Sequence, residues 1–69
     1  MKYAVVIERG PTSDSASVPD LPGCFAVGET LEEVERLIEE AIASHIETLK
    51  KQGKHVPAPQ TQVRTVDAG

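Results

Sequence analysis

The sequence predicts an α+β fold: a small β-β-β-α-β domain in which one long helix covers one face of an antiparallel-type sheet. The helix is predicted by an apolar stripe at helical spacing over residues 31–52. The sheet is predicted by β-branched and aromatic segments between Gly and Pro residues, three before the helix and one after it. The 69 residues fit one domain, with an ordered core expected over about residues 2–66.

Three segments before the helix are predicted to be strands. Residues 2–8 (K-Y-A-V-V-I-E) contain a continuous apolar run, which predicts a central strand covered on both faces. Residues 16–18 predict a short second strand that pairs with the first across a polar turn. Pro19–Gly23 (P-D-L-P-G) is a stiff turn, and residues 24–27 predict a third strand that Gly28 ends.

The helix has start and stop signals. Thr30 and Glu33 form a capping box, in which each side chain accepts a hydrogen bond from the N–H of the other residue. Lys50 and Lys51 suit the C-terminal end of the helix dipole, and Gly53 suits the position after the helix. The predicted apolar stripe, with Ile42 near its centre, consists of Leu31, Val34, Leu37, Ile38, Ala41, Ile42, His45, Ile46 and Leu49.

The chain after the helix is predicted to return to the sheet. Residues 54–59 (K-H-V-P-A-P) form an irregular connection. Residues 60–66 (Q-T-Q-V-R-T-V) have the Thr and Val content of a final strand at a sheet edge. Because one helix covers only one sheet face, and edge strands keep unpaired backbone groups, we expect another chain to cover what remains.

Composition and charge exclude several classes of protein. Seven basic and eleven acidic residues give a net charge of −4, which argues against direct nucleic-acid binding. The longest apolar run, Tyr3–Ile7, is too short for a membrane span or a signal peptide. A chain this small buries only about 60% of its unfolded surface, so we expect a homo-dimer or homo-tetramer. The single Cys24 fits the reducing cytoplasm.

Two linked motifs give the chain a family resemblance. The first, S-V-P-D-L-P-G-C-F-A-V-G-E-T-L-E-E, spans Ser17–Glu33 and joins a P-D-L-P-G-C turn to a G-E-T-x-x-E helix start. The second is G-K-H-V-P-A-P at Gly53–Pro59, after a helix of the right length. Together they resemble the HicB-like antitoxin family, and the resemblance spans Tyr3 to Pro59.

The resemblance implies a partial ribonuclease H-like fold and a role in a type II toxin–antitoxin pair. Antitoxins of this family bind a small basic HicA-type ribonuclease toxin and occlude its active surface. Only ten residues follow Pro59, so we expect a single-domain form that lacks the C-terminal DNA-binding domain of many members. The alternative is a stand-alone oligomeric module, regulatory or for assembly, without a toxin partner.

Acidic residues are concentrated on the predicted helix. Seven of the eleven lie in it or just before it. They fit an ordinary solvated face, and the helix dipole favours the early ones. Under the family resemblance, the same face would meet a cationic toxin, because complementary charge raises association rate and selectivity. The stiff turn is a second candidate contact. The candidate partner-binding residues are Glu32, Glu33, Glu35, Glu39, Glu40, Asp20, Leu21 and Pro22.

Two catalytic alternatives receive little support from the sequence. Two-metal nuclease chemistry needs several converging acids, whereas two of the available acids lie in predicted turns. Cys24 with His45 or His55 lacks an evident third group to orient the pair. We therefore expect no enzyme activity, no metal and no cofactor. The acids that the nuclease alternative would use are Glu8, Asp14, Asp20 and Glu29.

Overall fold

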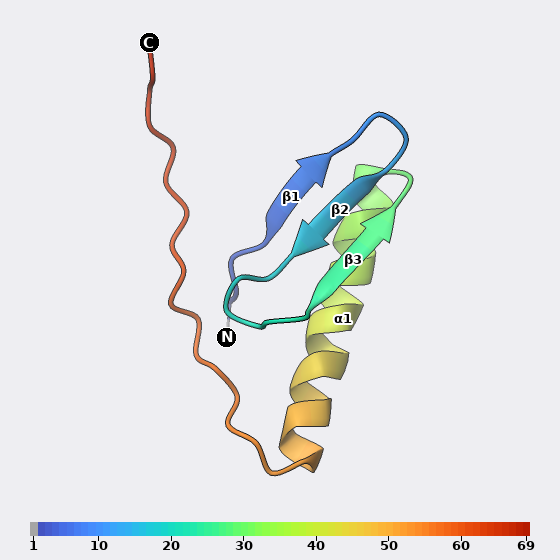
Figure 1. Cartoon of the computed structure of the whole chain (residues 1–69), viewed down its shortest axis with the longest axis vertical. Helices are drawn as coiled ribbons and strands as arrows, with labels where there is room; N and C mark the ends of the chain where they lie inside the picture. The colour runs from blue at the N-terminus through green and yellow to red at the C-terminus, as the bar shows by residue number, and fades with distance from the viewer. Residues whose placement is uncertain (1) are drawn as a thin grey trace.

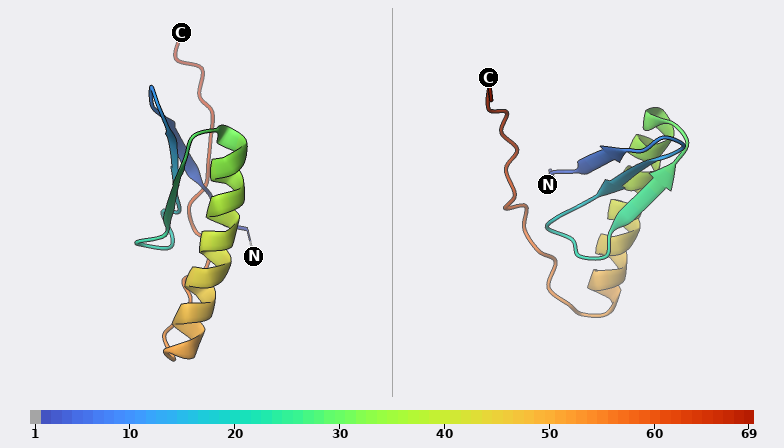
Figure 2. Two further views of the ribbon diagram at one scale, coloured as in Figure 1. Left: turned by 90° about the vertical axis from the view of Figure 1, so that its right-hand side faces the viewer. Right: turned by 45° about the horizontal axis from the view of Figure 1, so that its top comes forward.

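Three short strands and one long helix make up the fold of this computed structural model, which describes residues 2–69 (Figure 1). The strands form one antiparallel sheet in the order β1-β2-β3, and the helix lies against one face of it (Figure 2). This arrangement confirms the predicted α+β fold. The elements are β1 (Val6–Arg9), β2 (Asp14–Ser17), β3 (Phe25–Gly28) and α1 (Leu31–Lys51).

The core lies between α1 and the strands β2 and β3. Within the predicted stripe, Val34 and Ile38 are the buried members, whereas Ile42 is only half-buried. The centre of the buried stripe is therefore between one and two helical turns closer to the N-terminus than the sequence predicts. The buried core consists of Ala16, Val18, Leu21, Cys24, Ala26, Val34 and Ile38.

The ends of α1 follow the predicted signals closely. Thr30 precedes the helix, and its Oγ1 accepts the N–H of Glu33 at 3.1 Å. At the other end Gly53 has a positive φ of 69°, and its N–H donates to the carbonyl of Lys50 at 3.1 Å. The N–H of Lys54 donates to the carbonyl of Leu49 at 2.9 Å, which completes a Schellman motif.

The strand β1 is an edge strand, so the predicted central position is wrong. The sheet order leaves one side of β1 without a neighbour, and all four of its residues are exposed. The apolar run misled the prediction because α1 packs against β2 and β3 and leaves the helix-facing side of β1 open. The other two strands form with small shifts, over residues 14–17 and 25–28.

The predicted final strand over residues 60–66 is also wrong, since within the described residues no strand follows α1. The chain after α1 instead runs past the β1 side of the sheet as an extended segment without joining it (Figures 1 and 2). Thr and Val content favours a strand, but a strand must also pair with a neighbouring strand. Residues 60–66 have no such pairing in this single chain.

Close packing at Gly28 leads to a first testable prediction. A Cβ atom at this position would lie 3.0 Å from Cγ2 of the fully buried Val34 and 3.2 Å from Cγ of Glu33. We expect Gly28→Ala to lower the free energy of unfolding by about 1–3 kcal/mol, because a crowded core must shift to admit the methyl group. Urea denaturation followed by circular dichroism measures the change. Gly69→Ala, where a Cβ atom meets nothing within 4 Å, is the control and should be neutral.

Candidate functional site

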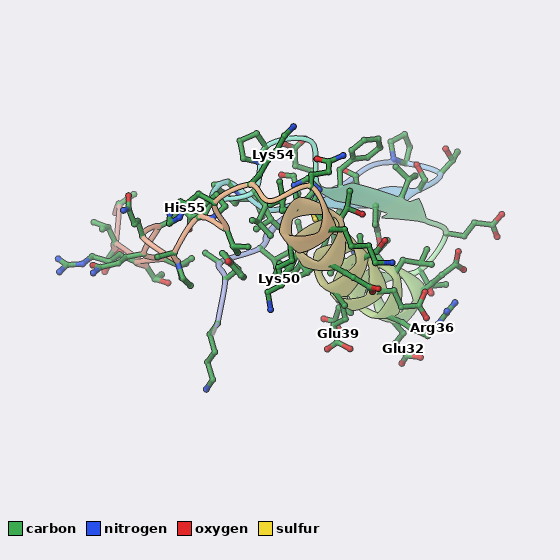
Figure 3. All side chains as sticks on the ribbon, turned by 90° about the horizontal axis from the view of Figure 1, so that it is seen from below. Glu32, Arg36, Glu39, Lys50, Lys54 and His55 are labelled. Carbon is green, nitrogen blue, oxygen red and sulfur yellow. The ribbon has the colours of Figure 1, made fainter. Side chains whose placement is uncertain are left out.

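The helix α1 presents most of its acidic side chains to solvent. Its buried positions face the sheet, whereas Glu32, Arg36 and Glu39 project from the opposite side (Figure 3). Glu35 and Glu40 are exposed as well. The predicted acidic face is therefore accessible along the first half of the helix.

Ion pairs neutralise only part of this face. Nη1 of Arg36 lies 3.5 Å from Oε1 of Glu40, and Nζ of Lys51 lies 3.1 Å from Oε1 of Glu47. Such exposed pairs contribute about 0.3–0.5 kcal/mol each. Among the ion pairs of residues 2–69, none involves Glu32, Glu35 or Glu39. These three residues are called the acidic helix surface below.

Glu33 has a different environment from the other helix glutamates. It is half-buried, and its carboxylate lies over Gly28, where Oε1 would be 3.2 Å from a Cβ atom. The described residues contain the bond from the Glu33 N–H to Thr30, but not the reciprocal bond of the predicted capping box. Its carboxylate is therefore less available to a partner than those of the acidic helix surface.

The turn Pro19–Gly23 is held by backbone hydrogen bonds and directs Leu21, one of the predicted contact residues, into the core. The N–H of Leu21 donates to the carbonyl of Val18 at 3.1 Å, and Gly23 takes a positive φ of 84°. Leu21 is fully buried in the core, so its side chain is not available to a partner in this structure. Pro22 remains exposed at the tip of the turn.

Asp20 holds the segment that follows the helix. Its Oδ2 accepts the N–H groups of Gln60 at 3.1 Å and Thr61 at 3.0 Å, and its Oδ1 accepts the Thr61 hydroxyl at 2.9 Å. The bond from the Thr61 N–H is the main cause that lowers the pKa of Asp20, against a smaller opposing effect of desolvation. Asp20, Gln60 and Thr61 are together called the tail clasp. A second tie joins the Tyr3 hydroxyl to the carbonyl of Pro57 at 2.5 Å.

The tail clasp should open in acid. Because the folded pKa of Asp20 is lowered, the clasp is fully formed above the unfolded pKa of about 3.9 and is lost as the pH falls through the folded value. We expect the amide resonances of Gln60 and Thr61 to move toward their random-coil positions on acidification, as measured by NMR. Asp20→Ala should give those positions already at neutral pH. Unchanged resonances in that variant would contradict the clasp.

The acids of the nuclease alternative do not meet. Asp14 is buried, and its Oδ1 lies 3.5 Å from Nε of Arg9. Asp20 is engaged in the tail clasp. Glu8 is paired in register with Ser15, on the sheet face opposite the buried row. Within residues 2–69, no group of three or more His, Cys, Asp or Glu side chains is placed to hold a metal ion.

The Cys–His alternative is also not assembled as a reactive pair. Cys24 is buried in the core, and this burial raises the pKa of its thiol, which keeps it protonated and poorly nucleophilic. His45 is half-buried on α1 and His55 is exposed in the connection after it.

Within the described part of the chain, no helix is long and apolar enough to cross a membrane.

The fold and this surface together define a small α+β module with an acidic helix and open sheet edges. The chain belongs to the HicB-like antitoxin family: the family described as HicB_like antitoxin of bacterial toxin-antitoxin system matches residues 3–68. This match confirms the resemblance that the two sequence motifs indicate.

Relatives of similar length occur in archaea. The UPF0150 protein Ta0767 of Thermoplasma acidophilum is 41% identical over 69 residues, which cover 99% of this chain and all of that protein. A UPF0150 protein of Archaeoglobus fulgidus is 32% identical over 94% of this chain and 99% of its own. An uncharacterized 14.9 kDa protein of Haemophilus phage HP1 is 40% identical over 83% of this chain, but over only 43% of its own length.

A solved structure has the same fold. A chain in a HicA3 and HicB3 toxin–antitoxin complex is 33% identical to this one and superposes with a TM-score of 0.74. The match covers 87% of this chain and 70% of that one. Fold and family therefore both connect this chain to toxin–antitoxin systems.

Proposed function

We propose that this chain is an antitoxin that binds a small basic HicA-type ribonuclease toxin and neutralises it by occluding the toxin's active surface. The observation that carries the proposal is the 33% identity and shared fold with a chain of a HicA3–HicB3 complex. Family membership over residues 3–68 supports the same role. Occlusion requires no chemistry from the antitoxin, so we propose a non-enzymatic protein without a cofactor that acts in the cytoplasm.

The acidic helix surface is the proposed centre of contact with the toxin. A ribonuclease must attract RNA phosphates and therefore carries basic side chains near its active site. Glu32, Glu35 and Glu39 offer such a protein three carboxylates without ion-pair partners in the described chain. Complementary charges of this kind accelerate association and favour one partner over others.

The remaining predicted contact residues have smaller proposed roles. Glu40 is already paired with Arg36, and Glu33 lies against Gly28, so both stand at the margin of the surface. Asp20 acts in the tail clasp, and Leu21 is left out because it is buried. Pro22 is exposed in the turn and is free to touch a partner.

Co-purification tests the proposed partnership. We expect the tagged chain to retain the small basic protein encoded by the adjacent gene at low salt, and to release part of it as salt screens the acidic helix surface. Bovine serum albumin and an unrelated basic protein of similar size serve as controls for non-specific retention. An adjacent product that is not retained at micromolar concentration would contradict the proposal.

A stand-alone oligomeric module is the second candidate function. The outer sheet face favours this candidate, because Phe25 is 68% exposed there and Val27 is 55% exposed. A second copy that covered these apolar side chains would stabilise so small a domain. We propose that the chain forms a homo-dimer or homo-tetramer in either case. A defined oligomer together with no binding to the adjacent gene product would favour the second candidate over the first.

A further inference from the structure

A pocket of about 440 Å³ lies between the turn that joins β2 to β3 and the connection that follows α1 (Figure 1). The turn belongs to the first of the two sequence motifs, and the connection belongs to the second. The pocket is therefore the place where the two motifs meet. The turn contributes Pro19, Asp20 and Pro22 to the lining, and the connection contributes His55, Pro57 and Ala58.

The walls of this pocket are held in place by the chain itself. Each of the three prolines in the lining has a φ fixed by its ring. The tail clasp holds the connection against the turn, and the Tyr3 hydroxyl donates to the carbonyl of Pro57 at 2.5 Å. A ligand that enters has few further groups to order, so its binding costs little conformational entropy.

Hydrogen-bond acceptors prevail over donors in the lining. The three prolines contribute carbonyl groups but no N–H. The N–H of Gln60, which also lines the pocket, is already donated to Asp20. The side chains of the lining that can donate are the His55 imidazole and the Gln60 amide. A ligand that is rich in donors and free of acceptors suits such a lining.

Asp20 gives the pocket a negative charge. Its pKa is lowered, chiefly by the bond from the Thr61 N–H, so the carboxylate is ionised at neutral pH. A carboxylate has about four acceptor sites. The tail clasp uses three of them, which leaves an acceptor site and the charge for a ligand. Because Asp20 is half-buried, its charge is screened less than that of a fully exposed side chain.

We propose that this pocket binds the guanidinium group of an arginine side chain from a partner protein. The guanidinium group is a cation with several N–H donors and no acceptor, which matches the lining. It can donate to Asp20 while the methylene groups of its side chain pack on the proline rings. Lysine fits less well, because its ammonium group is strongly hydrated and apolar walls do not replace that water. Pro22 and Ala58 are exposed, so the pocket opens to the surface where a partner can reach it.

Titration of the ¹⁵N-labelled full chain with N-acetyl-arginine methylamide, a blocked arginine, tests the pocket by NMR. We expect the amide resonances of Asp20, His55 and Ala58 to shift and to saturate. Blocked lysine should bind more weakly. Blocked citrulline, which has nearly the same shape without the charge, should give no saturating shift. Equal affinity for blocked arginine and blocked lysine, or the absence of saturating shifts with blocked arginine, would overturn the proposal.

Variants of the lining test the location of the site. Ala58→Phe fills the pocket from an exposed position and keeps the Asp20 carboxylate, so it should abolish the shifts. Ala68→Phe adds the same ring at the exposed end of the chain and should bind blocked arginine as the parent chain does. Asp20→Asn removes the charge at nearly constant size and should also abolish binding. Unchanged binding in both lining variants would overturn the proposal, and circular dichroism checks that each variant is folded.

Two further measurements identify the source of the guanidinium group. Free L-arginine should bind more weakly than blocked arginine, because Asp20 repels its carboxylate. Tighter binding of the free amino acid would overturn the assignment to a protein side chain. Arg64→Gln should leave the affinity for blocked arginine unchanged, whereas a higher affinity would show that the chain's own arginine competes for the pocket and would overturn the proposed partner. These experiments omit the toxin, so their outcome is independent of the proposed antitoxin function.

Discussion

Replacing Ile38 by Ala should lower the free energy of unfolding by about 2–5 kcal/mol, enough to leave much of the protein unfolded. Ile38 is 3% exposed and joins the helix to a core of only seven buried apolar residues. Removing three carbon atoms leaves a cavity that short strands on either side cannot close without losing other contacts. Urea denaturation monitored by circular dichroism measures the loss.

Two further variants show whether the loss comes from the core. Ile38→Val removes one methylene group and should cost about 0.5–1.5 kcal/mol. Val27→Ala changes a residue on the outer sheet face and should cost no more than about 0.5 kcal/mol. If Val27→Ala cost as much as Ile38→Ala, the assigned position of the core between α1 and the sheet would be wrong.

Reversing the acidic helix surface should slow association with the toxin by roughly 10- to 1,000-fold at low salt. The variant combines Glu32→Lys, Glu35→Lys and Glu39→Lys, which lie outside the buried core. The expected effect comes from losing an attractive field and creating a repulsive one. Stopped-flow or surface plasmon resonance measurements give the association rate, and the difference should shrink as salt rises.

The matched control changes net charge by the same amount at other places. It combines Glu8→Lys on the sheet, Glu47→Lys near the end of α1 and Asp67→Lys in the tail. This control should slow association much less, because its charges do not form one surface. Equal slowing by both triple variants would show that only net charge matters and would refute the acidic helix surface as the contact.

Local patterns predicted the helix and its ends well. Thr30 and Gly53 act through bonds to residues a few positions away, so the sequence contains the whole signal. The buried stripe was also predicted, although its centre lies at Val34 and Ile38 because the short sheet covers only the first half of the helix.

Contacts between distant residues were not predictable in the same way. The clasp joins Asp20 to Gln60 and Thr61, about forty positions away, and the local sequence around Asp20 indicates only a turn. The edge position of β1 depends on which strands the helix covers, which the apolar run of residues 2–8 does not encode. The concentration of acidic residues on the helix could be predicted from the sequence, but the pairing of Glu40 and the inward position of Leu21 required the structure.

Inhibition of the adjacent gene product is the most direct test of the antitoxin function. The purified basic protein would be assayed for cleavage of a structured RNA while this chain is titrated in. Antitoxin function predicts that cleavage falls to background near a fixed stoichiometric ratio, and that the triple Lys variant of the acidic helix surface needs a large excess. Cleavage that continues unchanged at saturating concentrations of this chain would contradict the proposed function.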